Sequence, residues 1–426
     1  MKLSNWYQDV TPPAAEDVVR ADAWTSKRNM GWTFRNTGAT HGALMCPRDG
    51  AIIELPDALD DRCAVEATSY QDFFGQSATF GPAMIAAQVE GIIVLKAGSI
   101  RYERYHDGLN RLDHHLWLSV TKSMVACCVG ILADEGKLDP SDRVTAYIPE
   151  LTDSVFGGDT TVQHLLDMST TPDIEEGQVG FAAINPARTE SWEMQWARAA
   201  RWAPNPKSAF PESGYQGLAD MLQRLPKRDM GYGHGHIFRY ESVNTDVLGW
   251  IVARLSGQPL QAFVSERIWQ RIGAAHDGFF FPDYANIALA SGGFNSTLRD
   301  AARFGLMVLN RGRVNGEQVV PEAWLDRVAT GVTEDDRDRM RRSSFGQPGN
   351  ITSAPYLDAY KDQWWIMDGT NGVFMASGRH GQLIYVNRTA DVCAALFSTR
   401  FDGGNVTSPT FKTALAGLHA YAQSLA

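Results

Sequence analysis

The chain has 426 residues, of which 44% are hydrophobic and 21% are charged. This composition is typical of globular proteins and excludes disordered, collagen-like and coiled-coil chains. The net charge of -10, from 39 basic and 49 acidic side chains, argues against nucleic acid or an anionic membrane surface as the main partner.

The first residues and the cysteines indicate the cellular compartment in which the protein is expected. Gln8, Asp9 and Pro12 follow Met1 where a secretory signal would have an apolar run. No window reaches the ~18 uninterrupted apolar residues that a membrane span needs. The five cysteines are odd in number and lack the spacing of a metal site, which suits a reducing compartment. We therefore expect a cytoplasmic protein with no membrane segment and no bound metal.

The first half of the chain predicts an extension, a hairpin and a buried helix. Residues 1–80 are rich in polar and turn-forming residues, and we expect them to wrap a core. Strands at 92–96 and 100–105 flank Ala97-Gly98-Ser99, a good hairpin signal. From Ser119 the apolar residues recur at helical spacing as far as Glu135-Gly136, where the glycine suits a helix C-terminus.

The rest of the chain predicts helices followed by strands. We expect helices at 161–168 and 244–255, separated by a stretch at 170–235 that is too long for a plain loop. Strand patterns then follow at 372–376, 381–387 and 392–398, before an amphipathic helix at 411–425.

Strands at both ends of the chain with helices between them predict an α/β (α+β) fold. It would have one antiparallel sheet built from both ends, flanked by helices, with an α-rich lobe inserted. We place the N-terminal extension at 1–80, the sheet domain at 81–140 and 285–426, and the lobe at 141–284.

One short motif in the sequence is a candidate reaction centre. The sequence has no H-E-x-x-H, G-x-x-x-x-G-K-[ST], G-x-S-x-G or C-x-x-C pattern, so metalloprotease, P-loop and α/β-hydrolase mechanisms lose their main support. Ser119 and Lys122 form an S-x-x-K at the start of the predicted helix, where residues three apart share a face. A lysine with a pKa lowered by burial can take the proton of a serine hydroxyl. By itself, a serine that caps a solvated helix explains the motif equally well.

Two segments further along the chain resemble motifs that accompany S-x-x-K in one enzyme superfamily. Tyr240-Glu241-Ser242 lies near the start of the predicted helix 244–255, and Gly378-Arg379-His380-Gly381 lies at a late strand. In this order the three segments resemble the motifs of the serine β-lactamase and penicillin-binding protein superfamily: S-x-x-K, then Y-x-N or Y-x-S, then K-T-G or H-x-G. The likeness is strongest to the class C-like branch, which holds esterases and 6-aminohexanoate-dimer (nylon oligomer) hydrolases. It rests on residues 116–123, 240–250, 291–305 and 380–382, and it covers about residues 80–425.

The resemblance implies a β-lactamase/transpeptidase-like fold and an acyl-enzyme mechanism that needs no cofactor. It implies that Ser119 is acylated, and that Lys122 and Tyr240 share the proton transfers. The oxyanion hole would be formed by the backbone N–H groups of Ser119 and of a residue near Arg379.

Two departures from the β-lactamase motifs favour an amidase or esterase. Arg379-His380-Gly381 stands where penicillin-recognising enzymes have Lys-Thr-Gly, although Arg379 can still hold an anion. Ser242 stands where class C β-lactamases have asparagine.

Further substrate contacts are predicted from residue type and place. His380 belongs to the third motif. Asn295 either contacts the substrate or caps the following helix. Trp365 and Phe181, with Trp192, either pack in the core or line an apolar pocket.

We therefore predict a serine hydrolase that cleaves a small amide or ester, with a linear ω-amino acid dimer as the substrate that the resemblance suggests. One alternative is a catalytically silent penicillin-binding-like protein that binds a peptide or a partner protein. A true β-lactamase is another. The oligomeric state is not fixed by the sequence, and a homodimer is one possibility.

Overall fold

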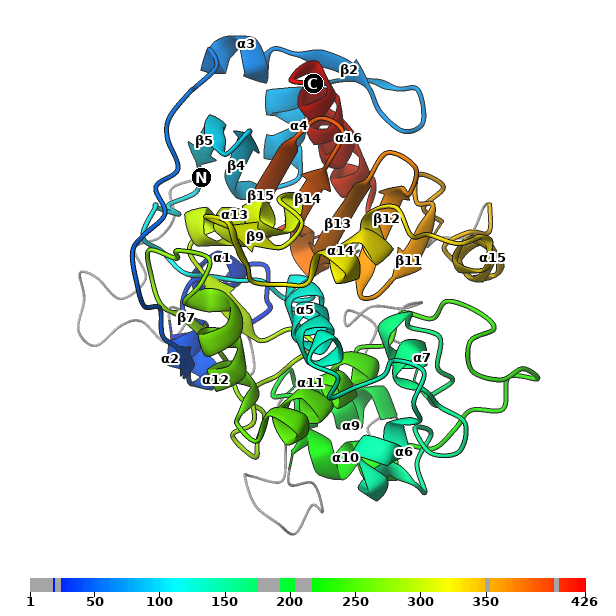
Figure 1. The fold of residues 1–426 in the computed structure, drawn as a ribbon. Helices are drawn as coiled ribbons and strands as arrows, with labels where there is room; N and C mark the ends of the chain where they lie inside the picture. The colour runs from blue at the N-terminus through cyan, green and yellow to red at the C-terminus, as the bar shows by residue number, and fades with distance from the viewer. Residues whose placement is uncertain (1–17, 20–23, 175–191, 204–216, 349–352, 402–405) are drawn as a thin grey trace.

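A seven-stranded antiparallel sheet lies at the centre of the larger half of the molecule (Figure 1). The computed structural model describes residues 18–19, 24–174, 192–203, 217–348, 353–401 and 406–426. The strand order is β11-β12-β13-β14-β15-β4-β5, so two early strands join five late ones. The sheet is thus built from both ends of the chain, as predicted. Its strands are β4 (Val89–Lys96), β5 (Ser99–Tyr105), β11 (Ala359–Lys361), β12 (Trp364–Asp368), β13 (Val373–Gly378), β14 (Gln382–Asn387) and β15 (Val392–Ser398).

The predicted hairpin is confirmed by β4 and β5. Lys96 pairs with Ser99, and the two residues between them, Ala97 and Gly98, have φ angles of 50° and 77°. A two-residue turn with both φ angles positive matches the twist of the flanking strands, and glycine adopts such angles without steric cost.

The sheet is buried on both faces. On β15, Ala394 belongs to the core that also holds residues of α4 and α16, while its neighbours Cys393 and Ala395 belong to the core that holds residues of α5 and α13. Successive strand residues point to opposite faces, so two covered faces explain the nearly continuous apolar runs. The covering helices are α4 (Phe80–Ala86), α5 (Val120–Asp134), α13 (Leu298–Leu309) and α16 (Pro409–Ser424).

Short helices form the lower half of the molecule around α11 (Figure 1). α11 confirms the predicted helix at 244–255, and α7 lies inside the predicted helix at 161–168, where the Thr161 side chain caps it. These helices are α6 (Val144–Tyr147), α7 (Val162–Leu166), α9 (Trp192–Ala199), α10 (Leu218–Arg224), α11 (Val243–Ser256) and α12 (Leu260–Val264), with a 3₁₀ turn at Pro149–Leu151 and a π-helical turn at Ser265–Trp269.

A second, four-stranded sheet connects the N-terminal region to the centre of the chain. Its order is β1-β7-β8-β6, and every pairing in it is antiparallel. Its strands are β1 (Leu44–Cys46), β6 (His115–Leu116), β7 (Gly278–Phe280) and β8 (Phe294–Ser296). Because β6 leads directly to α5, this sheet fixes where α5 begins.

Several elements were not predicted from the sequence. The turn between β11 and β12 uses Asp362 and Gln363 at φ angles of 46° and 67°, without the glycine that marks such turns. The helix α15 (Glu334–Arg342) is almost entirely charged and has no apolar stripe. The other helices are one to three turns long, and the other strands are two or three residues long: α1 (Met30–Thr33), α2 (Thr37–His41), α3 (Arg62–Glu66), α14 (Glu322–Ala329), β2 (Ser69–Gln71), β3 (Ser77–Thr79), β9 (Arg313–Val314) and β10 (Glu317–Gln318).

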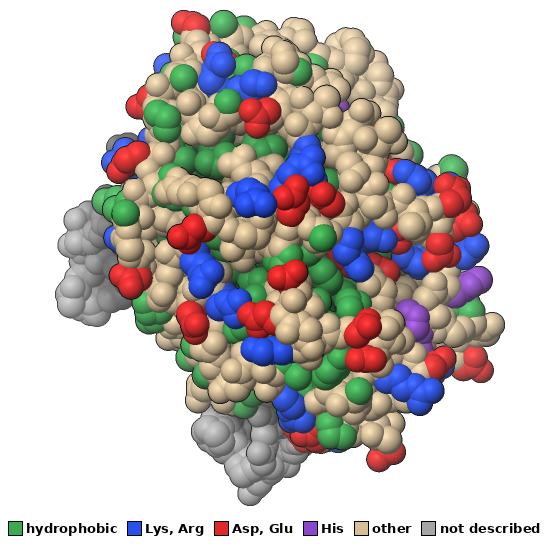
Figure 2. Space-filling model, viewed as in Figure 1, with side chains coloured by type: hydrophobic (Ala, Val, Ile, Leu, Met, Phe, Trp, Pro, Cys, Tyr) green, Lys and Arg blue, Asp and Glu red, His purple; other side chains and the backbone are tan. Residues whose placement is uncertain are grey.

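The surface carries mixed charge. On the face shown in Figure 2, acidic and basic side chains are interspersed among apolar ones. Within the described ranges, every helix is too short or too polar to cross a bilayer.

Gly130 tests the packing of α5. A Cβ built at this position would lie 2.4 Å from Cγ of Trp324 on α14. We expect Gly130→Ala to lower the free energy of unfolding by about 1–3 kcal/mol through overpacking, reduced by the better helix propensity of alanine. The measurement is the midpoint of urea unfolding.

Gly233→Ala is the matched control, because a Cβ there meets no atom within 4 Å. If both variants unfold at the wild-type urea concentration, the Trp324 ring moves aside freely and α5 is not held from that side.

Candidate active site

Ser119 lies at the start of α5, in a position fixed by buried contacts. The preceding Trp117 donates its backbone N–H to the Phe294 carbonyl over 2.8 Å and its ring N–H to Ser296 Oγ over 2.8 Å. Leu118, between Trp117 and Ser119, has a φ of 50°, which is rare for a leucine and indicates a strained turn. The chain is therefore held firmly on the residues that present Ser119.

The Ser119 side chain points to Lys122 and makes no capping hydrogen bond. Lys122 Nζ donates to Ser119 Oγ over 2.8 Å and to the Ser291 carbonyl over 2.6 Å. The Lys122 side chain is only 1% exposed. The i, i+3 spacing on α5 thus brings the two side chains of the S-x-x-K together in a buried place, so the solvated helix cap is not what the structure shows.

Tyr240 also lies close to Lys122. The Nζ atom is 5.2 Å from the centroid of the Tyr240 ring. Tyr240 stacks on Trp365 of β12, with ring centroids 5.2 Å apart and an interplanar angle of 23°. The structure therefore brings together four predicted residues: Lys122 contacts Ser119 and the Tyr240 ring, and Trp365 stacks on Tyr240.

The third motif lies at the end of β13, close to Ser119. A Cβ at Gly378 would lie 3.2 Å from the backbone nitrogen of Ser119 and 2.6 Å from the Trp117 carbonyl oxygen. Only glycine allows this close approach. Arg379 follows Gly378 in the sequence and begins a 3₁₀ turn. Gly378 belongs to the third motif in the sequence, but no structural role was predicted for it.

His380 packs into the protein from this turn. Its φ is 62°, and its ring makes an edge contact with Phe34 at a centroid distance of 5.5 Å. Nδ1 lies 2.7 Å from the Arg400 carbonyl oxygen, to which a neutral ring donates. Burial lowers the pKa of His380 to about 3, so the ring is neutral at pH 7. The predicted contact of His380 with substrate stays a prediction.

Asn295 is fully buried on β8. Its Oδ1 accepts from Thr37 Oγ1 over 2.6 Å, and its Nδ2 donates to the Gly293 carbonyl over 2.8 Å. The bond from Thr37 ties α2 to β8, and the residue that caps α13 is Thr297. Trp192 begins α9, and the predicted pocket residue Phe181 lies outside the described residues.

Asp246 of α11 is a further group near the site that the sequence did not single out. Its Oδ1 accepts from the Ser291 N–H over 3.0 Å, and its Oδ2 accepts from Trp196 Nε1 over 2.9 Å. Burial raises the pKa of Asp246 to about 6, against the lowering effects of these donors and of the Lys122 charge. An acidic residue inside an otherwise apolar helix pattern was the signal for it.

This arrangement has the parts of a covalent hydrolase. A hydroxyl contacts an amine, the amine lies over a phenol ring, and two backbone segments meet beside the hydroxyl. Within the described part of the chain, no three His, Cys, Asp or Glu side chains gather as metal ligands.

Known proteins match almost the whole chain. The family described as Beta-lactamase matches residues 78–417. The 6-aminohexanoate-dimer hydrolase of Paenarthrobacter ureafaciens is 31% identical over 390 residues, which cover 91% of this chain and 90% of that protein.

Solved structures show the same fold. A structure from Bacillus anthracis, named provisionally as a 6-aminohexanoate-dimer hydrolase, has a TM-score of 0.79 and 26% identity, and the match covers 97% of this chain and 98% of the other. A D-stereospecific amidohydrolase from Streptomyces has a TM-score of 0.52 at 16% identity, covering 80% and 98% of the two chains, and shows the fold alone.

The predicted fold class is therefore confirmed by both the observed sheet and the solved relatives. Since the family covers most of the chain and a relative is 31% identical over nine-tenths of it, the chain belongs to the Beta-lactamase family and is a hydrolase of the serine β-lactamase superfamily.

Proposed function

We propose that the protein hydrolyses a small linear amide or ester through an acyl-enzyme on Ser119, and that a 6-aminohexanoate-dimer-type amide is its substrate class. The observation that carries this proposal is the 2.8 Å contact between Lys122 Nζ and Ser119 Oγ in a buried place. The name of the Paenarthrobacter relative supports the substrate class. Ester cleavage follows the same steps with an easier leaving group.

In the first step, Ser119 Oγ attacks the carbonyl carbon of the substrate. Lys122, in its neutral form, takes the hydroxyl proton as the C–O bond forms and the carbonyl π electrons move to oxygen. Burial favours this neutral form, because a charged ammonium loses solvation inside a protein. The geometry supports Lys122 as the base, since it is already within hydrogen-bond distance of Oγ.

The resulting oxyanion needs donors fixed in advance. The Ser119 N–H and the N–H near Arg379 are the proposed pair, and the close approach of Gly378 to Ser119 supports that choice. Each such donor contributes about 3 to 4 kcal/mol in comparable sites.

The leaving group then departs with a proton. Tyr240 gives its phenol proton to the leaving amine or alcohol, and the proton held by Lys122 restores the phenol. Water attacks the acyl-enzyme by the same route and frees the acid. The contacts of Lys122 Nζ with Ser119 Oγ and with the Tyr240 ring support this exchange.

Replacing Ser119 tests the nucleophile. We expect Ser119→Ala to lose amide and ester turnover by at least about a thousandfold with the fold intact, because one hydroxyl carries the covalent step. Lys122→Ala should be about as severe, since the two residues act as a unit. The measurements are kcat on a p-nitrophenyl ester and the intact mass after a fluorophosphonate probe.

Ser123→Ala is the control, because this serine lies on the same helix and donates to the Gln363 carbonyl. It should keep the label and most of the rate. Labelling of Ser119→Ala at the wild-type level would place the nucleophile elsewhere, and no labelling of the wild type at any pH would favour a binding protein.

Replacing Tyr240 tests the proton donor. An amine leaves only when it is protonated, whereas p-nitrophenolate leaves without help. We expect Tyr240→Phe to slow amide hydrolysis at least about tenfold more than p-nitrophenyl ester hydrolysis. The quantity measured is the ratio of the two losses in kcat/KM. Equal losses would mean that Tyr240 orients or activates Ser119 and does not protonate the leaving group.

A β-lactam tests the selectivity of the second and third motifs. Ser242 and Arg379-His380-Gly381 alter two polar contacts, and each unpaired group costs about 1 to 3 kcal/mol. We expect kcat/KM for nitrocefin to be at least about a hundredfold below that for the best p-nitrophenyl ester. The two rates are measured on one preparation at one pH, with and without EDTA, which should change neither. Equal rates would identify a true β-lactamase.

A further inference from the structure

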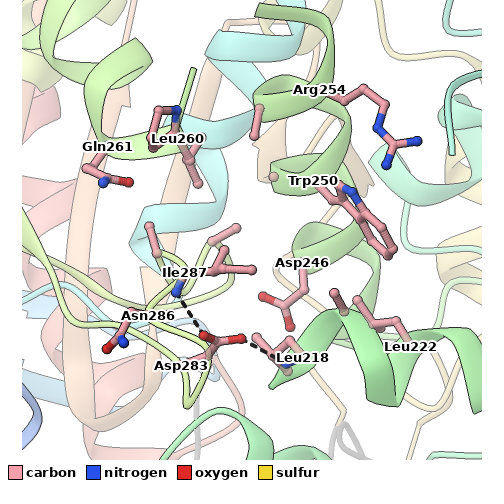
Figure 3. A pocket seen from close by; sticks show the side chains of 16 residues that line it. Leu218, Leu222, Asp246, Trp250, Arg254, Leu260, Gln261, Asp283, Asn286 and Ile287 are labelled. Carbon is pink, nitrogen blue, oxygen red and sulfur yellow. Dashed lines mark hydrogen bonds between the residues drawn. The ribbon is translucent and has the colours of Figure 1, made fainter. Parts of the chain in front are cut away.

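Asp246 lines a cavity of about 410 Å³ (Figure 3). Residues of α10, α11, the start of α12 and the loop at 283–290 line the cavity, and most of them are apolar, such as Leu222, Trp250 and Leu260. A carboxylate in such a wall loses solvation, and an apolar residue would be easier to bury. The contacts of Asp246 should therefore explain why it is there.

Those contacts lead to the catalytic pair. Asp246 Oδ1 accepts from the Ser291 N–H over 3.0 Å, and the Ser291 carbonyl accepts from Lys122 Nζ over 2.6 Å. Trp196 Nε1 holds the other carboxylate oxygen over 2.9 Å. A chain of hydrogen bonds thus runs from Trp196 on α9, through Asp246 on α11 and the main chain of Ser291, to Lys122 on α5.

We propose that Asp246 is a positioning residue for catalysis, which holds the Ser291 main chain so that its carbonyl directs Lys122 Nζ at Ser119 Oγ. This inference rests on the proposed function of Ser119 and Lys122. A lysine side chain has four rotatable bonds, and a second fixed acceptor restricts it to one direction. Displacement of a reacting group by about 1 Å can cost about a hundredfold in rate.

The charge of Asp246 adds to this positioning. When Lys122 takes the serine proton it becomes an ammonium, and the buried carboxylate nearby stabilises that charge. Asp283 and Arg254 are the other charged residues in the cavity wall. Asp283 is held by backbone donors from Leu218 and Ile287, and Arg254 pairs with Glu150.

The test compares Asp246→Ala, Asp246→Asn and Asp283→Asn, each checked for folding by circular dichroism. The substrate is a p-nitrophenyl ester, and kcat, KM and the pH profile of kcat are measured. We expect Asp246→Ala to lose about 30- to 100-fold in kcat with KM within about threefold, because Lys122 is misdirected while the substrate still binds. Asp246→Asn keeps an acceptor for the Ser291 N–H. The fall in log kcat should therefore be smaller than in Asp246→Ala by at least about a third.

The pH profile separates positioning from simple packing. In the wild type, kcat should fall as the pH drops through about 6, where Asp246 takes up a proton and loses its charge. That component should be absent in Asp246→Asn and present in Asp283→Asn, the control that replaces another buried carboxylate of the same cavity.

Two results would overturn the inference: kcat of a folded Asp246→Ala within threefold of wild type, or an unchanged component near pH 6 in Asp246→Asn. If Asp246→Ala does not fold, the pH profile of Asp246→Asn alone decides whether Asp246 has the positioning role. The outcome is distinct from failure of the proposed function, because a wild type that is never acylated at Ser119 refutes that function before any Asp246 variant is measured.

Discussion

The hydrogen bond between Lys122 and Ser119 is the contact on which the rest of the structure depends. It requires a lysine amine to be buried, which costs solvation free energy unless the amine has acceptors. The structure supplies Ser119 Oγ on one side and the Ser291 carbonyl on the other. The strained turn at Leu118 precedes the first acceptor, and Asp246 accepts from the N–H of Ser291, whose carbonyl is the second acceptor.

The antiparallel sheet explains how residues far apart in the sequence reach this amine. β4 lies before α5 and β15 lies near the C-terminus, yet they pair directly, and β13 is two strands further along the same sheet. The end of β13 therefore arrives beside the start of α5, where Gly378 approaches the Ser119 nitrogen. Tyr240 comes from the helical half, at the entry to α11, so the site forms where the two halves meet (Figure 1).

The sequence was informative where chemistry or periodicity was local. The hairpin at β4 and β5, the helices α5 and α11, the late strands and the S-x-x-K contact could all be read from spacing or turn residues. β11 and β12 could not, since their turn has no glycine, and α15 could not, because its many charges give no apolar stripe. Asp246 escaped because its significance depends on Ser291, a loop residue 45 positions away, and no local pattern encodes that contact.

The N-terminal region shows why a weak sequence pattern does not mean a minor structural role. Phe34 is fully buried, and its ring contacts both His115 and His380. Its carbonyl also accepts from the N–H of Leu116. His115 lies four residues before Ser119, and His380 follows Arg379, so one aromatic ring contacts both backbone segments that approach each other at Ser119. An oxyanion hole made of two separate segments works only if their spacing is rigid. The early residues carry none of the three motifs, but through Phe34 they contact both segments from which the proposed oxyanion hole is built.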